Sequence, residues 1–263
     1  GGDRPTLPLR RYLTFLAYAY NESAGGFRNF MAYDRRWLED IGSPDSQGRT
    51  LWALGVTVSA APDEDTRDLA HDLFIKALPG VSAFRDLRSK AFALLGLDPY
   101  LQRYPDNSQL STRASAPAKA LRDRYAQDLF DAFARAASDD WPWCEDLATY
   151  DNAKLCHALL VAGDAMGRDD MVRQALTSLA WLLKVQRSPK GFLSIIGNDG
   201  WLPRGGKKAD FDQQPLEAHA LVHACLDAAT ITGDAVWADH AWQCFRWFTG
   251  ENDLGVSLYA PDT

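Results

Sequence analysis

The sequence has few cysteines and no long apolar run, and both shortages narrow what the protein can be. Its four cysteines form no C-x-x-C or other close pair, so their spacing selects no disulfide connectivity. Three of them lie within helical apolar patterns, which favours buried free thiols. No apolar stretch approaches the ~20 residues that a membrane-spanning helix needs. We therefore expect no membrane span.

An excess of positive charge and a targeting signal are also missing. The formal net charge of −7 argues against nucleic acid or an anionic membrane as a general partner. Residues 1–5 are not a signal peptide and are typical of an artificial start, at which targeting information can be cut away. The predicted location is the cytoplasm.

Helical periodicity is present nearly throughout the 263 residues, and only 192–196 alternates briefly with period two. The pattern predicts an all-α fold in one domain, residues 1–263. The predicted helices cover about 9–20, 47–58, 64–78, 82–95, 117–137, 151–163, 168–186, 213–230 and 235–249.

Three of these helices begin in a similar way, with an aspartate at or just before an apolar helix: Asp45, Asp151 and Asp212. A repeated helical hairpin can stack into a solenoid or close into a toroid. Long polar connections at 24–45, 138–150 and 187–211 all lead into these helices, so we expect a functional face there.

The stretch from Gly197 to His219 is the strongest candidate for a ligand site. Its first half is too rich in Gly and Pro for regular structure. Asp212 is predicted to cap the helix that follows, with Pro215 in its first turn. Trp, Asp, Gln and Arg together suit a sugar, which offers an apolar ring face and many hydroxyl groups.

Several motifs together resemble a known family. They are Tyr33–Asp40, Asp45–Arg49, Trp141–Asp146, Tyr150–Ala153, Gly197–Trp201 and Phe211–Ala218. Over about residues 10–260 the chain is similar to the helical (α/α) toroid domains of the six-hairpin glycosidase type, especially those attached to, or encoded beside, bacterial group 1 glycosyltransferases. The resemblance implies a glycan or oligosaccharide ligand, a glycosyltransferase as a partner, and no cofactor.

Two features limit the resemblance. A closed ring of six hairpins needs about twelve helices, whereas nine are predicted here. Either an end of the chain is truncated or the toroid is incomplete at the C-terminus. The glycine-rich fingerprint of dinucleotide-binding folds is missing, so the chain is not expected to be a complete glycosyltransferase.

Hydrolysis of a glycan requires two carboxyl groups. The catalytic candidates are Asp34, Glu145, Asp151, Asp212 and Glu217, although an aspartate before a helix is more often a cap. The substrate-binding candidates are Tyr33, Asp45, Arg49, Trp143, Trp201, Arg204, Gln213, Gln214, His157 and His219. Trp143 and Trp201 either stack on a sugar or pack on a helix end.

Two alternatives to a hydrolase stay open. One is a non-catalytic glycan-recognition or scaffolding domain that works with a glycosyltransferase. The other is a sugar epimerase that moves protons through His157 and His219. His219 and His223 are also spaced to share a metal, but no third ligand matches them, so no metal is expected.

Overall fold

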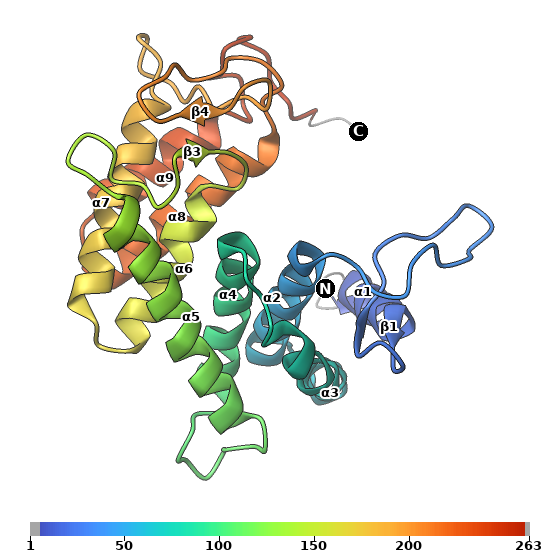
Figure 1. The fold of residues 1–263 in the computed structure, drawn as a ribbon. Coiled ribbons are helices and arrows are strands. Elements are labelled where there is room, and N and C mark those ends of the chain that lie inside the picture. Colours follow the sequence, from blue (N-terminus) through green and yellow to red (C-terminus); the bar gives the residue numbers. More distant parts are fainter. Residues whose placement is uncertain (1–5, 261–263) are drawn as a thin grey trace. The chain divides into compact units, whose positions relative to one another are not determined.

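The structure is a computed structural model, and it describes residues 6–260. Residues 1–5, for which an artificial start is predicted, lie outside that range. The described chain is all-α, as predicted, with nine helices and four strands of two residues each (Figure 1). It divides into two compact units, Gly1–Tyr125 and Ala126–Thr263, which are described separately here.

The first unit contains four complete helices and one short hairpin. Its elements are α1 (Thr6–Ala19), β1 (Tyr20–Asn21), β2 (Gly26–Phe27), α2 (Pro44–Ala60), α3 (Glu64–Val81) and α4 (Leu87–Arg103), and α5 (Ser115–Ala136) begins here and ends in the second unit. The helices α2, α3 and α4 each begin at a side-chain cap. Ser43, Asp63 and Asp86 accept hydrogen bonds from backbone N–H groups three residues later.

The predicted end of a helix at Gly96 is wrong, because this glycine serves close packing rather than a turn. The backbones of α2 and α4 approach so closely that a Cβ built on Gly55 would lie 1.9 Å from the carbonyl oxygen of Gly96. Only glycine fits such a contact. The apolar helix α4 therefore continues through Gly96 to Arg103.

The second unit is built from two helical hairpins and the loops between them. Its elements are β3 (Leu147–Ala148), α6 (Ala153–Ala165), α7 (Asp169–Val185), β4 (Leu202–Pro203), α8 (Pro215–Thr232) and α9 (Val236–Arg246). α6 packs against α7, α8 against α9, and α6 also against α8. Strands β3 and β4 pair antiparallel and so join the loop before α6 to the loop before α8.

The predicted cap of α8 is wrong. The helix begins at Pro215 with Gln214 in the capping position, where no side-chain cap bond forms. Asp212 lies further upstream with a left-handed backbone, φ 59°. Its carboxylate therefore makes no cap bond to the first turn of α8.

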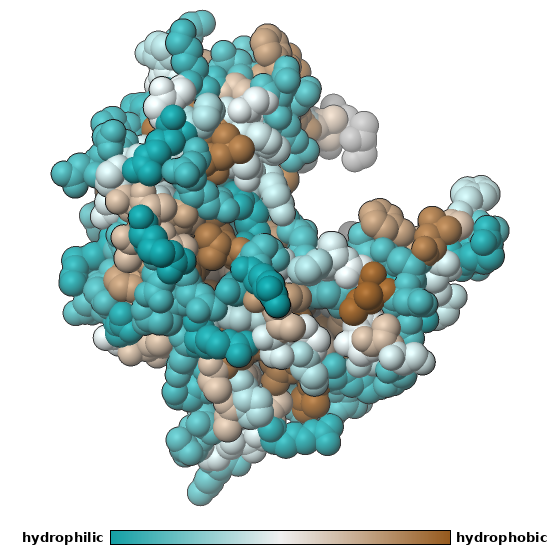
Figure 2. All heavy atoms as spheres, in the orientation of Figure 1, coloured by the Kyte–Doolittle hydropathy of each residue, from teal (hydrophilic) through white to brown (hydrophobic). Residues whose placement is uncertain are grey.

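Polar residues cover most of the face shown in Figure 2, and apolar residues appear there in separate small groups. No helix in the described part of the chain combines the length and apolar character needed to cross a bilayer.

Candidate functional site

A cleft of about 770 Å³ lies in the second unit, where three loop segments meet. The first segment follows α7, the second leads into α8, and the third follows α9. These segments form the first, second and third walls of the cleft. The second segment belongs to the stretch that the sequence marks as the strongest ligand-site candidate. The lining residues are Arg187, Ser188, Pro189, Ser194, Lys208, Asp210, Phe211, Asp212, Gln213, Pro215, Trp247, Asn252, Asp253, Leu254 and Leu258.

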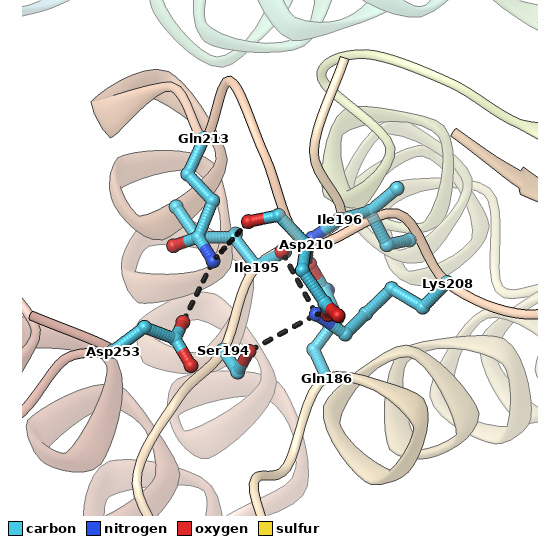
Figure 3. Close-up of polar contacts among 8 residues, drawn as sticks. All are labelled: Gln186, Ser194, Ile195, Ile196, Lys208, Asp210, Gln213 and Asp253. Carbon is cyan, nitrogen blue, oxygen red and sulfur yellow. Dashed lines mark hydrogen bonds and ion pairs between the residues drawn. The ribbon is translucent and has the colours of Figure 1, made fainter. Parts of the chain in front are cut away.

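Lys208 fixes one wall of the cleft. Its Nζ donates to the Ser194 hydroxyl at 3.0 Å and to the Ile195 carbonyl at 3.3 Å, and it lies 3.1 Å from Oδ1 of Asp210 (Figure 3). The side chain is only 17% exposed. Three oxygens already surround the ammonium group. Its positive charge therefore stabilises the loop and is largely neutralised within the protein.

Gln213 joins the second wall to the third. Its Nε2 donates to Oδ2 of Asp253 at 2.7 Å and to the Asp210 carbonyl at 3.3 Å (Figure 3). Asn252 then shapes the third wall, because its Oδ1 accepts from the N–H groups of Leu254 and Val256. Side chains distant in the sequence thus give the cleft a defined form.

The cleft presents both apolar and acidic groups to solvent. Phe211 is 75% exposed and Leu254 is 83% exposed. The carboxylate of Asp212 makes no hydrogen bond with any residue that the structure describes, and Asp210 and Asp253 each engage one oxygen in the bonds above. An apolar ring beside several hydrogen-bond acceptors is the chemistry that a sugar ring requires.

A second group of polar side chains lies between α6 and α8. We call it the α6–α8 polar cluster: Asp151, Lys154, His157, Glu217, His219, His223 and Asp227. Glu217 is 2% exposed, and its carboxylate accepts from the backbone N–H groups of Asp151 and Asn152. It therefore satisfies donors at the start of α6, and this contact gives Glu217 a structural role.

The histidines of the α6–α8 polar cluster differ in their surroundings. Nε2 of His157 lies 2.5 Å from Oδ2 of Asp227, and burial lowers the pKa of His157. Burial and the nearby Lys154 charge lower the pKa of His223 to about 4. His219 is exposed, with its ring 4.2 Å from that of His223. Uncharged imidazoles are thus favoured at neutral pH.

In the part of the chain that the structure describes, no three His, Cys, Asp or Glu side chains are placed to hold a metal ion.

The candidates of the first unit are engaged in local ion pairs. Nε of Arg36 lies 2.7 Å from Asp34, and this hydrogen bond lowers the pKa of the Asp34 carboxyl. Nε of Arg49 lies 2.8 Å from Asp45, and its guanidinium group lies 4.0 Å from the centre of the Phe92 ring. Tyr33, at 106% exposure, projects fully into solvent.

The two tryptophan candidates occupy different environments. Trp143 is fully buried, with its ring against Phe133 and Trp181. This placement favours the packing alternative over sugar stacking for Trp143. Trp201 is half-buried in the loop before α8, where its carbonyl accepts from the N–H of Ala209.

The remaining candidates lie outside the cleft. Arg204 pairs with Asp146 at 3.3 Å and donates to the Ser138 hydroxyl. Glu145 is half-buried, and its carbonyl accepts from the indole of Trp141. Gln214 begins α8.

Of the sequence candidates, the cleft gathers Asp212 and Gln213, and the α6–α8 polar cluster gathers Asp151, Glu217, His157 and His219. Sequence reasoning missed the third wall, which Trp247 and Asp253 build after the last helix. The one available signal was Asn252-Asp253, a polar pair followed by exposed apolar residues.

Compared with known family models and with curated proteins, the sequence gives no match.

Proposed function

We propose that this chain is a carbohydrate-binding helical domain of the (α/α) toroid type, and that its ligand is a neutral glycan bound in the cleft. The observation that carries the proposal is the meeting of Phe211, an exposed ring, with Asp212 and Gln213 in one cleft. Aromatic stacking combined with side-chain hydrogen bonds is a suitable means of binding a sugar ring. The two helical hairpins of the second unit and the motif resemblance support the toroid.

A neutral glycan is favoured because three carboxylates line the cleft beside only two cations, Arg187 and Lys208. Lys208 is surrounded by three oxygens, and Arg204 pairs with Asp146. An acidic sugar would also meet the carboxylates of Asp210, Asp212 and Asp253 in the same cleft. Repulsion between like charges disfavours such a ligand.

Binding without turnover is the favoured activity, with hydrolysis as the second candidate. A hydrolase needs one carboxyl that donates a proton and one that is ionised, and the cleft contains Asp212 and Asp253 for such a pair. The epimerase alternative has less support, because His157 is buried and bonded to Asp227.

The test is calorimetric titration of neutral oligosaccharides, chosen from a glycan array, into the wild-type chain and three variants, one of which is a control. Asp212→Asn and Gln213→Ala should each weaken binding about tenfold, which corresponds to roughly 1.4 kcal/mol. Asp234→Asn, an exposed change beyond the other end of α8, should leave binding unchanged. Equal affinities for all four proteins would refute the cleft as the site.

Release of reducing sugar from the bound glycan separates the two activities. A binding domain gives none above the buffer rate. A hydrolase gives release that Asp212→Asn abolishes while the glycan still binds.

A further inference from the structure

Two buried hydrogen-bonding groups at the cleft have no partner among the residues that the structure describes. They are the indole Nε1 of Trp247 and the hydroxyl of Ser188. Trp247 is 5% exposed and Ser188 is 9% exposed, and both line the cleft. Buried polar groups are almost always satisfied, so these two point to an acceptor and a second polar atom supplied from within the cleft.

The chemistry of the two groups restricts what can satisfy them. An indole N–H donates only, so its partner must be an acceptor such as a carbonyl oxygen. A serine hydroxyl can accept as well as donate, so it can receive an N–H. One planar amide group offers both partners at once.

The apolar side chains that line the same cleft add a second requirement. Pro189, Pro215, Leu254 and Leu258 line the same cleft, and the two leucines are 83% and 52% exposed. An apolar lining favours a ligand group with a methyl or similar surface to bury. A sugar hydroxyl offers no such apolar surface, whereas the methyl group of an acetamide offers one.

We propose that Ser188 and Trp247 form a subsite for the acetamido group of an N-acetylated sugar. This inference depends on the proposed glycan-binding function and names its substrate class. The acetamide carbonyl accepts from Nε1 of Trp247, the acetamide N–H donates to the Ser188 hydroxyl, and the methyl group contacts Leu254 and Leu258. The subsite selects an N-acetylhexosamine over the corresponding plain hexose.

The test compares two β-1,4-linked disaccharides that differ in their acetamido groups, diacetylchitobiose and cellobiose, by calorimetric titration. The wild-type chain should bind diacetylchitobiose at least about tenfold more tightly, a difference of about 1.4 kcal/mol. Trp247→Phe keeps an aromatic ring and removes the N–H, so it should weaken the binding of diacetylchitobiose about tenfold more than that of cellobiose and thereby abolish this preference. Ser188→Ala, a smaller change to the fold, should reduce the preference severalfold.

Trp242→Phe provides the matched control, since this α9 tryptophan is 59% exposed and does not line the cleft. It should bind both disaccharides like the wild type. Equal wild-type affinities for the two disaccharides would overturn the subsite and leave glycan binding intact. A preference that survives in both Trp247→Phe and Ser188→Ala would also overturn it. Failure of every sugar to bind would overturn the proposed function together with this inference.

Discussion

At the scale of single residues, the sequence shows which side chains are suited to a sugar but not which of them reach solvent. Trp143 and Phe211 both stand in polar stretches with neighbouring aspartates or glutamates. The first is fully buried and the second is 75% exposed. The difference arises from contacts with rings such as Trp181, which lies on another helix. Burial of this kind depends on the assembled unit and cannot be predicted from neighbours in the chain.

Trp143→Ala should destabilise the protein strongly, because it leaves a cavity between Phe133 and Trp181. The expected loss is about 3–5 kcal/mol of unfolding free energy, the range for large aromatic side chains in a core. Trp242→Ala, which removes a 59% exposed ring, should lose less than about 1 kcal/mol. Urea unfolding followed by far-UV circular dichroism measures both. A stable Trp143→Ala protein that has lost glycan binding would instead assign this ring to the ligand.

At the scale of elements, the helices themselves could largely be predicted, because apolar periodicity and capping residues are local signals. Asp63, an aspartate directly before α3, caps that helix. The sequence-based predictions fail where a long-range contact determines the local structure or the role of a side chain. Gly96 continues a helix because of Gly55 on α2, and Glu217 of α8 accepts from backbone donors at the start of α6. Neither contact is visible in the spacing of residues along one helix.

Glu217→Gln should weaken the junction between α8 and the start of α6, because an amide cannot accept from both N–H groups as a carboxylate does. The expected loss is about 1–3 kcal/mol of unfolding free energy, the penalty for leaving buried donors unsatisfied. The control is Glu251→Gln, which changes a half-exposed ion pair with Arg246 and should matter little. The urea midpoints of the two variants are compared at neutral pH. An unchanged midpoint for Glu217→Gln, with binding or hydrolysis lost, would restore the catalytic hypothesis.

The α6–α8 polar cluster should make stability depend on pH. The pKa of His223 is lowered from 6.5 to about 4 in the folded protein, mainly by burial, so the unfolded chain takes up its proton first. Its contribution is therefore present above about pH 6.5 and is lost as pH falls towards 4. We expect about 1 kcal/mol from this half-buried group after solvent screening.

His223→Gln should flatten this decline. Urea unfolding at pH 7, 6, 5 and 4 measures the effect. Parallel pH profiles for the wild type and His223→Gln would show that this histidine does not contribute.

At the scale of the whole molecule, the all-α class follows from periodicity, but the cleft does not. One of its walls depends on Gln213 and Asp253, which are 40 residues apart. Another depends on the hydrogen bond from Lys208 to Ser194, which are 14 residues apart. Such pairs are set by how the second unit packs. The sequence predicted the stretch from Gly197 to His219 as the strongest candidate, part of which lines the cleft, and missed the segment after α9 that lines it too.

The reactivity of the four cysteines also depends on how the whole molecule packs. All are free and buried, and burial raises the pKa of the Cys156 thiol. Because the thiolate is the reactive form, a thiol reagent such as DTNB should react slowly with the native protein. All four cysteines should react at once in denaturant. Fewer than four thiols in the denatured, unreduced chain would indicate a disulfide.

The most direct test of a glycan cleft in the second unit is a crystal soaked with a mixture of neutral oligosaccharides. The expected result is a sugar ring against Phe211, with hydrogen bonds to Asp212 and to the Gln213–Asp253 wall. A ring bound elsewhere, for example at Trp201 or over His219, with the cleft occupied only by water, would contradict the proposal.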